Sequence, residues 1–282
     1  MVWAAAAAQR AIAAIALCAA AAAQTTQEEY LARFERLART VGPDGVGVET
    51  LLDRWEADFP DDRAVHVARF NYHFQKSLHT EMVAKGTQRR YLGNPPSLTL
   101  KDADGQDVNY FPEDIFDEER FAEAMKVLDR QIALHPDELR FHFLKVSALA
   151  AYEKESPDMA AAELKSVVER QASARPAWTL DGEPAGTELF QQGIGEYCYE
   201  FFRIGTPSGY EYFREISERM NKLFPKNPAF LDNLGSYQLV VKENEKQAEK
   251  FYKKALKLDP EDYAAKTNLQ IIERKKAQAK RK

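Results

Sequence analysis

The residues with the clearest capacity for chemistry are three aspartates in a polar segment. Asp102, Asp104 and Asp107 could offer carboxylate oxygens to a calcium ion, which prefers oxygen ligands. A calcium loop of the EF-hand type needs glycine at its sixth position and glutamate at its twelfth, whereas Gly105 stands fourth when Asp102 is counted first. The spacing therefore favours a solvated turn, and we predict no metal ligand among these residues.

The histidines are spaced unfavourably for binding one metal ion. His66 and His73 are seven residues apart, and so are His135 and His142. Seven residues span two helical turns, about 10 Å, which is too far for two ligands of one zinc ion. We therefore interpret all four as ordinary histidines.

Two glutamates complete the candidates for catalysis or metal binding. Glu196 and Glu200 are four residues apart, but they flank the apolar Tyr197 and Phe201, which favours the solvated edge of a helix. The sequence contains no G-x-S-x-G, P-loop, H-E-x-x-H or C-x-x-C motif. We therefore predict a protein without catalytic residues and without a bound cofactor.

The composition predicts a folded chain. The 282 residues are 45% hydrophobic and 29% charged, which is enough apolar material for a core. The formal net charge of −5 is mild for this length and argues against non-specific binding to nucleic acid.

Residues 1–23 have the composition of a secretory signal peptide. Arg10 precedes an apolar run, 11–23, which ends in an A-x-A pattern at Ala23, as signal peptidase requires. This run is shorter than the roughly 20 residues that span a membrane. We expect cleavage after Ala23, no stable membrane insertion afterwards, and a periplasmic or secreted mature chain, 24–282.

The two cysteines carry little function in this interpretation. Cys18 lies in the leader after Leu17, whereas lipid attachment needs a small residue there, so we do not expect a lipoprotein. Cys198 would then be the single remaining cysteine, unable to form an intramolecular disulfide. It lies within an apolar helical stripe, and we expect it to be packed there.

Apolar residues at helical spacing predict helices along most of the mature chain. The predicted ranges are 26–41, 46–58, 62–76, 119–134, 138–154, 158–174, 186–204 and 208–224, then two helices within 228–262 and a terminal helix 261–279. The exception is 77–115, where Leu98 and Leu100, then Val108 and Tyr110, alternate around Asp104-Gly105. We predict an inserted loop with one two-stranded hairpin there.

The stretch 228–262 has the residue types of a two-helix repeat. Small and large apolar residues recur at fixed spacing and end at a proline: Leu231, Leu234, Gly235, Ala248, Tyr252, Ala255 and Pro260. This pattern resembles the tetratricopeptide repeat (TPR). Ala124, Leu128 and Pro136 keep the second-helix spacings. The resemblance implies an all-α, right-handed solenoid of about five helix pairs plus the terminal helix.

The resemblance also implies a binding surface on the concave side, lined by the first helix of each pair. TPR proteins present such surfaces to protein or peptide partners. The positions expected there are Asp232, Asn233 and Ser236 in the clearest repeat, Asn71 and His73 in the second pair, and His142 and Lys145 in the third.

Two functions remain open from the sequence. The first is a non-enzymatic protein-protein interaction scaffold of the cell envelope, since the chain is similar in outline to exported TPR proteins of Gram-negative bacteria. The alternative is a hydrolase or carbohydrate-processing accessory protein whose site lies in 77–115. That site would use Asp102, Asp104 and Asp107 as metal ligands and Tyr91 or Tyr110 as a stacking platform.

Overall fold

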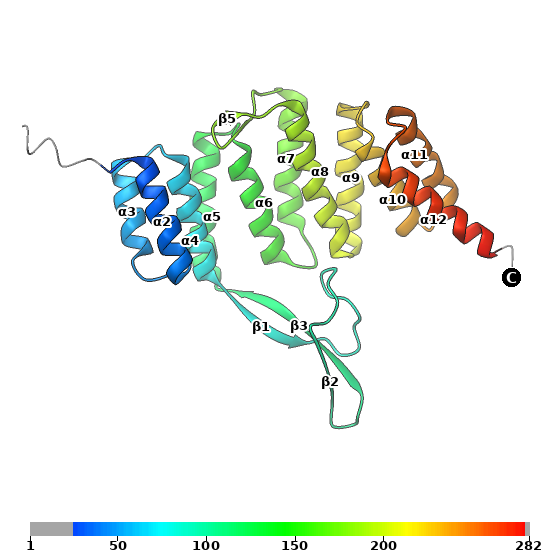
Figure 1. The fold of residues 1–282 in the computed structure, drawn as a ribbon, viewed down its shortest axis with the longest axis horizontal. Coiled ribbons are helices and arrows are strands. Elements are labelled where there is room, and N and C mark those ends of the chain that lie inside the picture. The colour runs from blue at the N-terminus through cyan, green and yellow to red at the C-terminus, as the bar shows by residue number, and fades with distance from the viewer. Residues whose placement is uncertain (1–24, 280–282) are drawn as a thin grey trace, which may run out of the picture. The chain divides into compact units, whose positions relative to one another are not determined.

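The computed structural model describes residues 25–279, which form mostly helices (Figure 1). The predicted leader and Cys18 lie outside this range. The all-α class is confirmed, and the helices begin and end within about two residues of their predicted bounds. The helices are α2 (Gln27–Val41), α3 (Val48–Asp58), α4 (Arg63–Ser77), α5 (Glu118–Leu134), α6 (Leu139–Glu153), α7 (Asp158–Ser173), α8 (Thr187–Ile204), α9 (Pro207–Leu223), α10 (Ala229–Val240), α11 (Glu245–Leu258) and α12 (Tyr263–Ala279).

The described chain divides into two compact units, with the boundary after Tyr72, inside α4. In the first unit, α2, α3 and the start of α4 enclose one apolar cluster. Trp55 is fully buried there, and its ring stacks on Tyr30 with centroids 6.0 Å apart. The indole Nε1 donates to Asp62 at 2.8 Å, so the buried polar atom of Trp55 is satisfied.

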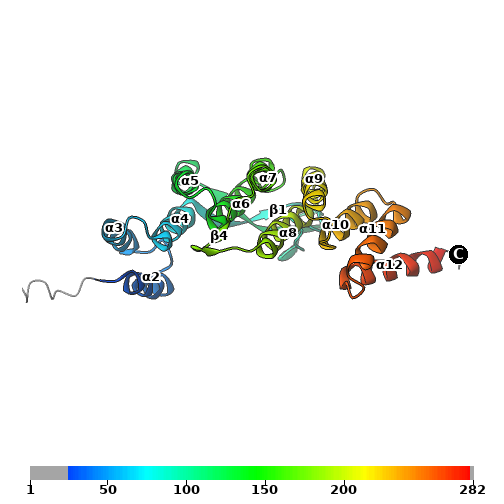
Figure 2. The same cartoon turned by 90° about the horizontal axis from the view of Figure 1, so that it is seen from above.

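In the second unit, helices α5 to α12 each pack against the next helix along the chain. Seen from above, α5, α7 and α9 form one row, and α6, α8 and α10 form another (Figure 2). Gly235 permits a close contact between α10 and α11, because a Cβ there would lie 2.6 Å from Cε1 of the buried Tyr252. The missing side chain at Gly235 therefore lets α10 and α11 come together.

One type of proline-containing turn recurs at four helix connections. In each, the preceding helix ends two residues before the proline, and a polar side chain two residues after the proline accepts a backbone N–H of the following helix. The prolines are Pro60, Pro136, Pro225 and Pro260, and the accepting residues are Asp62, Glu138, Asn227 and Asp262. These side chains satisfy amide groups that a helix start leaves unpaired.

The inserted segment is a three-stranded antiparallel sheet and not the predicted two-stranded hairpin. Its strands are β1 (Leu78–Ala84), β2 (Leu98–Lys101) and β3 (Asp107–Phe116), in the order β1-β3-β2. The prediction missed β1 because this strand leaves α4 directly, without a glycine or proline to mark the change. Its residues pair with β3 from Leu78 opposite Phe116 to Ala84 opposite Tyr110.

A second small hairpin, β4 (Thr179–Leu180) and β5 (Glu183–Pro184), lies in the connection between α7 and α8. Asp181 and Gly182 both have positive φ angles, 54° and 85°, as a two-residue hairpin turn requires. The buried Glu138 carboxylate holds this turn: it accepts the Asp181 and Gly182 amides at 2.8 and 2.9 Å and the Thr179 hydroxyl at 2.9 Å. The hairpin is therefore fixed to the start of α6.

Among residues 25–279, no helix combines the length and the apolar character that crossing a bilayer requires.

Candidate functional site

Two residues predicted to face a groove are buried, which corrects the expectation that they are exposed. Asp232 is 6% exposed and His142 is 5% exposed. Asp232 faces the turn that contains Asp262. The His142 ring contacts Glu163 Oε1 through Nδ1 at 2.7 Å and the Pro136 carbonyl through Nε2 at 3.1 Å. Both side chains are therefore held inside the helix packing.

The other predicted groove residues of the second unit have partners on neighbouring helices. Lys145 pairs with Asp129 and Glu163, each at 2.9 Å. Asn233 Nδ2 donates to Ser217 Oγ at 3.2 Å, and Ser236 Oγ lies 3.1 Å from the Tyr252 hydroxyl. These contacts tie helices together and leave the side chains half-buried.

Asn71 and His73 are both half-buried and lie on either side of the boundary between the two units. The predicted concave surface thus remains a prediction for these two positions.

The three aspartates of the insertion form a turn. Asp102 Oδ1 accepts the amides of Asp104 and Gln106 at 3.0 and 2.9 Å, and Asp107 pairs with Lys101 at 3.0 Å. Across the described residues, no three His, Cys, Asp or Glu side chains are grouped so that they could hold a metal ion. The metal site of the alternative function therefore finds no support in this geometry.

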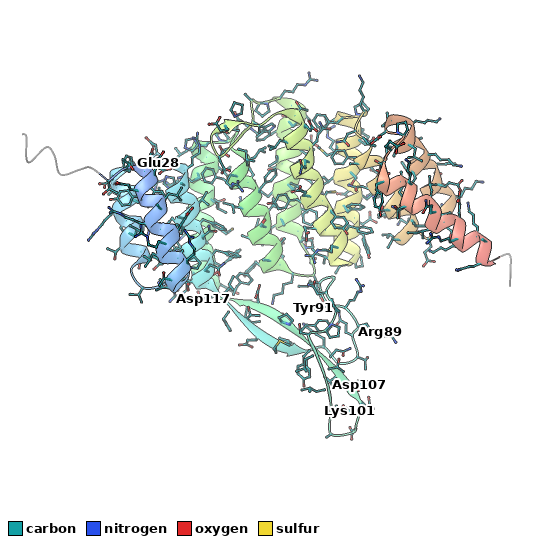
Figure 3. The ribbon with its side chains drawn as sticks, viewed as in Figure 1. Glu28, Arg89, Tyr91, Lys101, Asp107 and Asp117 are labelled. Carbon is teal, nitrogen blue, oxygen red and sulfur yellow. The ribbon has the colours of Figure 1, made fainter. Side chains whose placement is uncertain are left out.

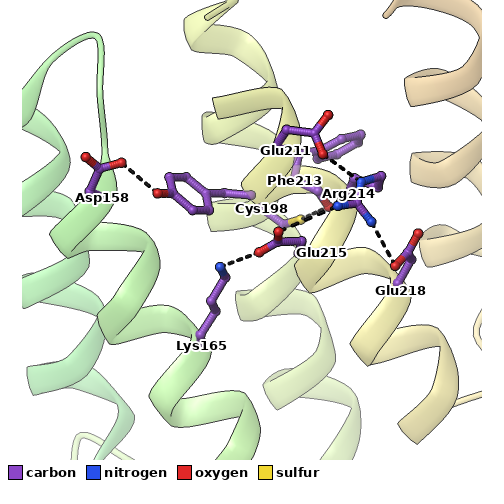
Figure 4. A network of polar contacts seen from close by, with 9 residues as sticks. Asp158, Lys165, Cys198, Glu211, Phe213, Arg214, Glu215 and Glu218 are labelled. Carbon is purple, nitrogen blue, oxygen red and sulfur yellow. Dashed lines mark hydrogen bonds and ion pairs between the residues drawn. The ribbon is translucent and has the colours of Figure 1, made fainter. Parts of the chain in front are cut away.

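Cys198 has the environment of a packed thiol. It is fully buried beneath the seam between α7 and α9, and Sγ donates to the Phe213 carbonyl at 3.3 Å (Figure 4). Burial raises the pKa of the Cys198 thiol to about 12, so the reactive thiolate is scarcely populated near neutral pH. The ion pair between Lys165 and Glu215 and the hydrogen bond from Tyr212 to Asp158 cross this seam.

An ionised glutamate anchors the inserted sheet to the helices. Glu113 of β3 pairs with Lys154, just after α6, at 2.6 Å and with Lys85, just after β1, at 2.8 Å. Burial alone would raise the pKa of Glu113, but hydrogen bonds from the two lysines outweigh burial and hold the pKa below its usual value. The carboxylate is therefore charged at neutral pH and fixes β3 to the end of α6.

The loop between β1 and β2 provides a second anchor. Tyr91 and Asn94 exchange backbone hydrogen bonds of 2.9 Å, which closes a tight turn. Gly93 in this turn has φ of 78°, and a Cβ there would lie only 2.4 Å from the carbonyl oxygen of Arg203 near the end of α8. Only glycine allows this approach, so the loop rests against α8.

One face of the anchored sheet is covered only around Phe111 and Glu113, while β2 is exposed on both of its faces. Phe111 and Glu113 point to the buried side, and their neighbours in sequence must point to the other. On that other side Met82 is 50% exposed, Leu98 45% and Leu100 47%. We call this the exposed sheet face; the strand register groups its residues as Met82, Leu98, Leu100, Val108, Tyr110 and Pro112.

A pocket of about 320 Å³ adjoins the exposed sheet face. Pro112 belongs to both surfaces, and Tyr91 and Phe111 pack edge to face at the pocket's base, with centroids 5.8 Å apart. The residues around it are Tyr91, Leu92, Asn94, Pro95, Pro96, Ser97, Phe111 and Pro112. The pocket has the apolar character and about the size that hold a side chain of a bound polypeptide.

The position of Tyr91 corrects one expectation. Tyr91 was predicted as an exposed stacking platform, but it is buried, with Lys85 Nζ 4.1 Å from the centre of its ring. Tyr110 is half-buried on the exposed sheet face. Figure 3 shows Tyr91 at the end of the insertion nearest the helices, with Lys101 and Asp107 at its far end.

Sequence reasoning recognised the alternation of Leu98, Leu100, Val108 and Tyr110 but gave it no binding role. The missed residue is Met82, whose strand carried no boundary signal. The arrangement offers an apolar surface for association. No protein-family model matches the chain, and a search of curated proteins returns no match either.

Proposed function

We propose that this protein is a non-enzymatic interaction scaffold, and that the exposed sheet face with its adjoining pocket is where a partner protein binds. The observation that carries the proposal is the exposure of Met82, Leu98 and Leu100 on a sheet whose opposite face is anchored to helices by Glu113. Apolar side chains gathered on one anchored surface are typical of protein-binding sites.

The geometry favours an extended polypeptide segment as the bound element. β2 pairs with β3 along one side only, so its other edge is available for a further strand. The exposed carboxylates of Asp102 and Asp104 lie beside Lys101 at the far end of β2. A partner strand with alternating apolar residues and a basic residue near this end would complement both surface and charge.

The helices supply the frame of this proposal. A right-handed solenoid of TPR-like pairs is supported by the recurring proline turns, the two rows of helices and the close approach at Gly235. Export to the periplasm or the exterior rests on residues 1–23 alone. The mass of the mature protein tests export, because an intact Met1 in cell extracts contradicts it.

A binding experiment with a matched control tests the function. Immobilised wild-type 24–282 and the variant Leu98→Asp/Leu100→Asp are exposed to an envelope extract of the source cell, and captured proteins are quantified. The control is Leu134→Asp, because Leu134 is 60% exposed at the end of α5 remote from the sheet. We expect the sheet variant to lose the specific partner and the control to keep it. Equal capture by all three proteins contradicts the proposal.

A further inference from the structure

The packing of α12 contains an unusual buried carboxyl group. Asp232 lies on α10, where α11 and α12 cover it, and it is 6% exposed. Within the described part of the chain, no hydrogen-bond donor reaches its Oδ1. A buried, ionised carboxylate without a compensating partner is strongly unfavourable, so this position selects the neutral acid.

The groups that face Asp232 add to this preference. Asp262 and Asp259, from the turn between α11 and α12, place negative charge nearby, and the Tyr252 hydroxyl lies on α11. On α12, Lys266 is paired with Glu261 at 2.8 Å. Burial first, and then Asp262 and Asp259, raise the pKa of Asp232 to about 8.

Asp262 is fixed in place by the start of α12. Its Oδ1 accepts the Ala265 amide at 2.8 Å, and its own amide donates to the Asp259 carbonyl at 3.1 Å. A protonated Asp232 can donate its hydroxyl to the Asp262 carboxylate, whereas two ionised carboxylates would repel each other across the junction of α10 and α12.

We propose that Asp232 and Asp262 share one proton, and that this proton holds α12 against α10 and α11 with a strength that falls as the solution becomes more alkaline. The other contacts of α12 are modest: Ala265 and Ile272 are buried against α11, and Lys276 pairs with Glu249 at 2.6 Å. Loss of the shared proton therefore releases α12 and uncovers the apolar side of α11, including Tyr252.

The direction of the pH effect follows from the raised pKa. An undocked Asp232 has the ordinary value of 3.8, so the undocked form loses its proton at lower pH than the docked form. Docking is strongest near or below pH 4, weakens as the pH rises towards about 8, and is constant above that. The opening equilibrium of α12 changes by up to about tenfold per pH unit inside this window.

Hydrogen exchange of the α12 amides, corrected for the intrinsic effect of pH, tests the proposal. In the wild type we expect protection of α12 to fall at least about tenfold between pH 5 and 8, with α6 as an internal reference. Asp232→Asn can still donate to Asp262 but does not titrate, so its α12 protection should be flat. The control Asp259→Asn keeps the shared proton and should keep the slope.

Flat protection in the wild type, or an unchanged slope in Asp232→Asn, overturns the proposal. A carbon-13 NMR titration of the wild-type carboxyl groups decides the case if Asp232→Asn fails to fold. An Asp232 carboxyl that titrates near pH 8 supports the shared proton, and one that titrates near pH 4 refutes it. The test does not depend on the partner surface of the insertion.

Discussion

Replacing Gly235 by alanine should destabilise the protein, although alanine favours a helix more than glycine does. The added Cβ would lie 2.6, 2.8 and 2.9 Å from three ring carbons of Tyr252. That ring is fully buried, and its hydroxyl contacts Ser236, so it has little room to move. The two helices would have to separate to relieve the overlap.

The size of the effect follows from two opposing contributions. Overpacking a well-filled core costs about 1–3 kcal/mol. Alanine gains about 1 kcal/mol over glycine inside a helix. Because the added Cβ would overlap three ring atoms, the cost of overpacking should lie in the upper part of that range of about 1–3 kcal/mol. After the gain from alanine is subtracted, we expect a net loss of about 1–2 kcal/mol in the free energy of unfolding.

A second glycine provides the control. Gly195 lies inside α8, and a Cβ there would meet nothing within 4 Å. Gly195→Ala should therefore stabilise the protein by about 0.5–1 kcal/mol. Urea unfolding followed by circular dichroism measures both variants. If Gly235→Ala raises the unfolding midpoint as Gly195→Ala does, the close contact between α10 and α11 is wrong.

Three further predictions concern other parts of the second unit. Cys198 should resist alkylation in the native protein at pH 8 and react once urea unfolds the chain, because burial raises its pKa to about 12; rapid native labelling would contradict this. Glu113→Gln should loosen the insertion by about 1–2 kcal/mol, seen as faster exchange of β3 amides. Because the pKa of Glu113 is lowered from 4.5, its ion pairs stabilise the insertion fully above that pH, and this stabilisation is lost as the pH falls further. The β3 strand of the wild type should therefore loosen in acid, whereas β3 of the variant should not. Glu138→Ala should free the β4–β5 turn, because the Asp181 and Gly182 amides lose their acceptor; it should destabilise the protein by about 1–2 kcal/mol and alter the fluorescence of Trp178, which directly precedes β4, and an unchanged spectrum would refute the anchoring role.

The helices could be predicted because their signals are local. Apolar spacing predicts most of them, a proline follows several of the helix ends, and the turns at Pro136 and Pro260 keep their repeat spacing. The hairpin at Asp181-Gly182 also had a local signal, the two-residue turn, but its strands are only two residues long and leave no alternation to detect.

The candidate site could be predicted only in part, because burial depends on packing partners far along the chain. Asp232 reads as an exposed helix position until Asp262 is placed over it by the α11–α12 turn. The exposed face needs Met82, which pairs opposite Pro112 across a long connection. Neither relation has a signature in the spacing of the residues themselves.

The partner surface is tested most directly by crosslinking from within it. A photoreactive amino acid at position 100, on the exposed sheet face, is compared with the same residue at position 134, at similar exposure on α5. We predict that position 100 gives one dominant crosslinked protein and that position 134 does not crosslink to this protein. A tenfold excess of the unlabelled mature chain should compete the crosslink at position 100 away. An absence of any specific adduct at position 100, or the same adducts from both positions, would contradict a partner-binding role for the insertion.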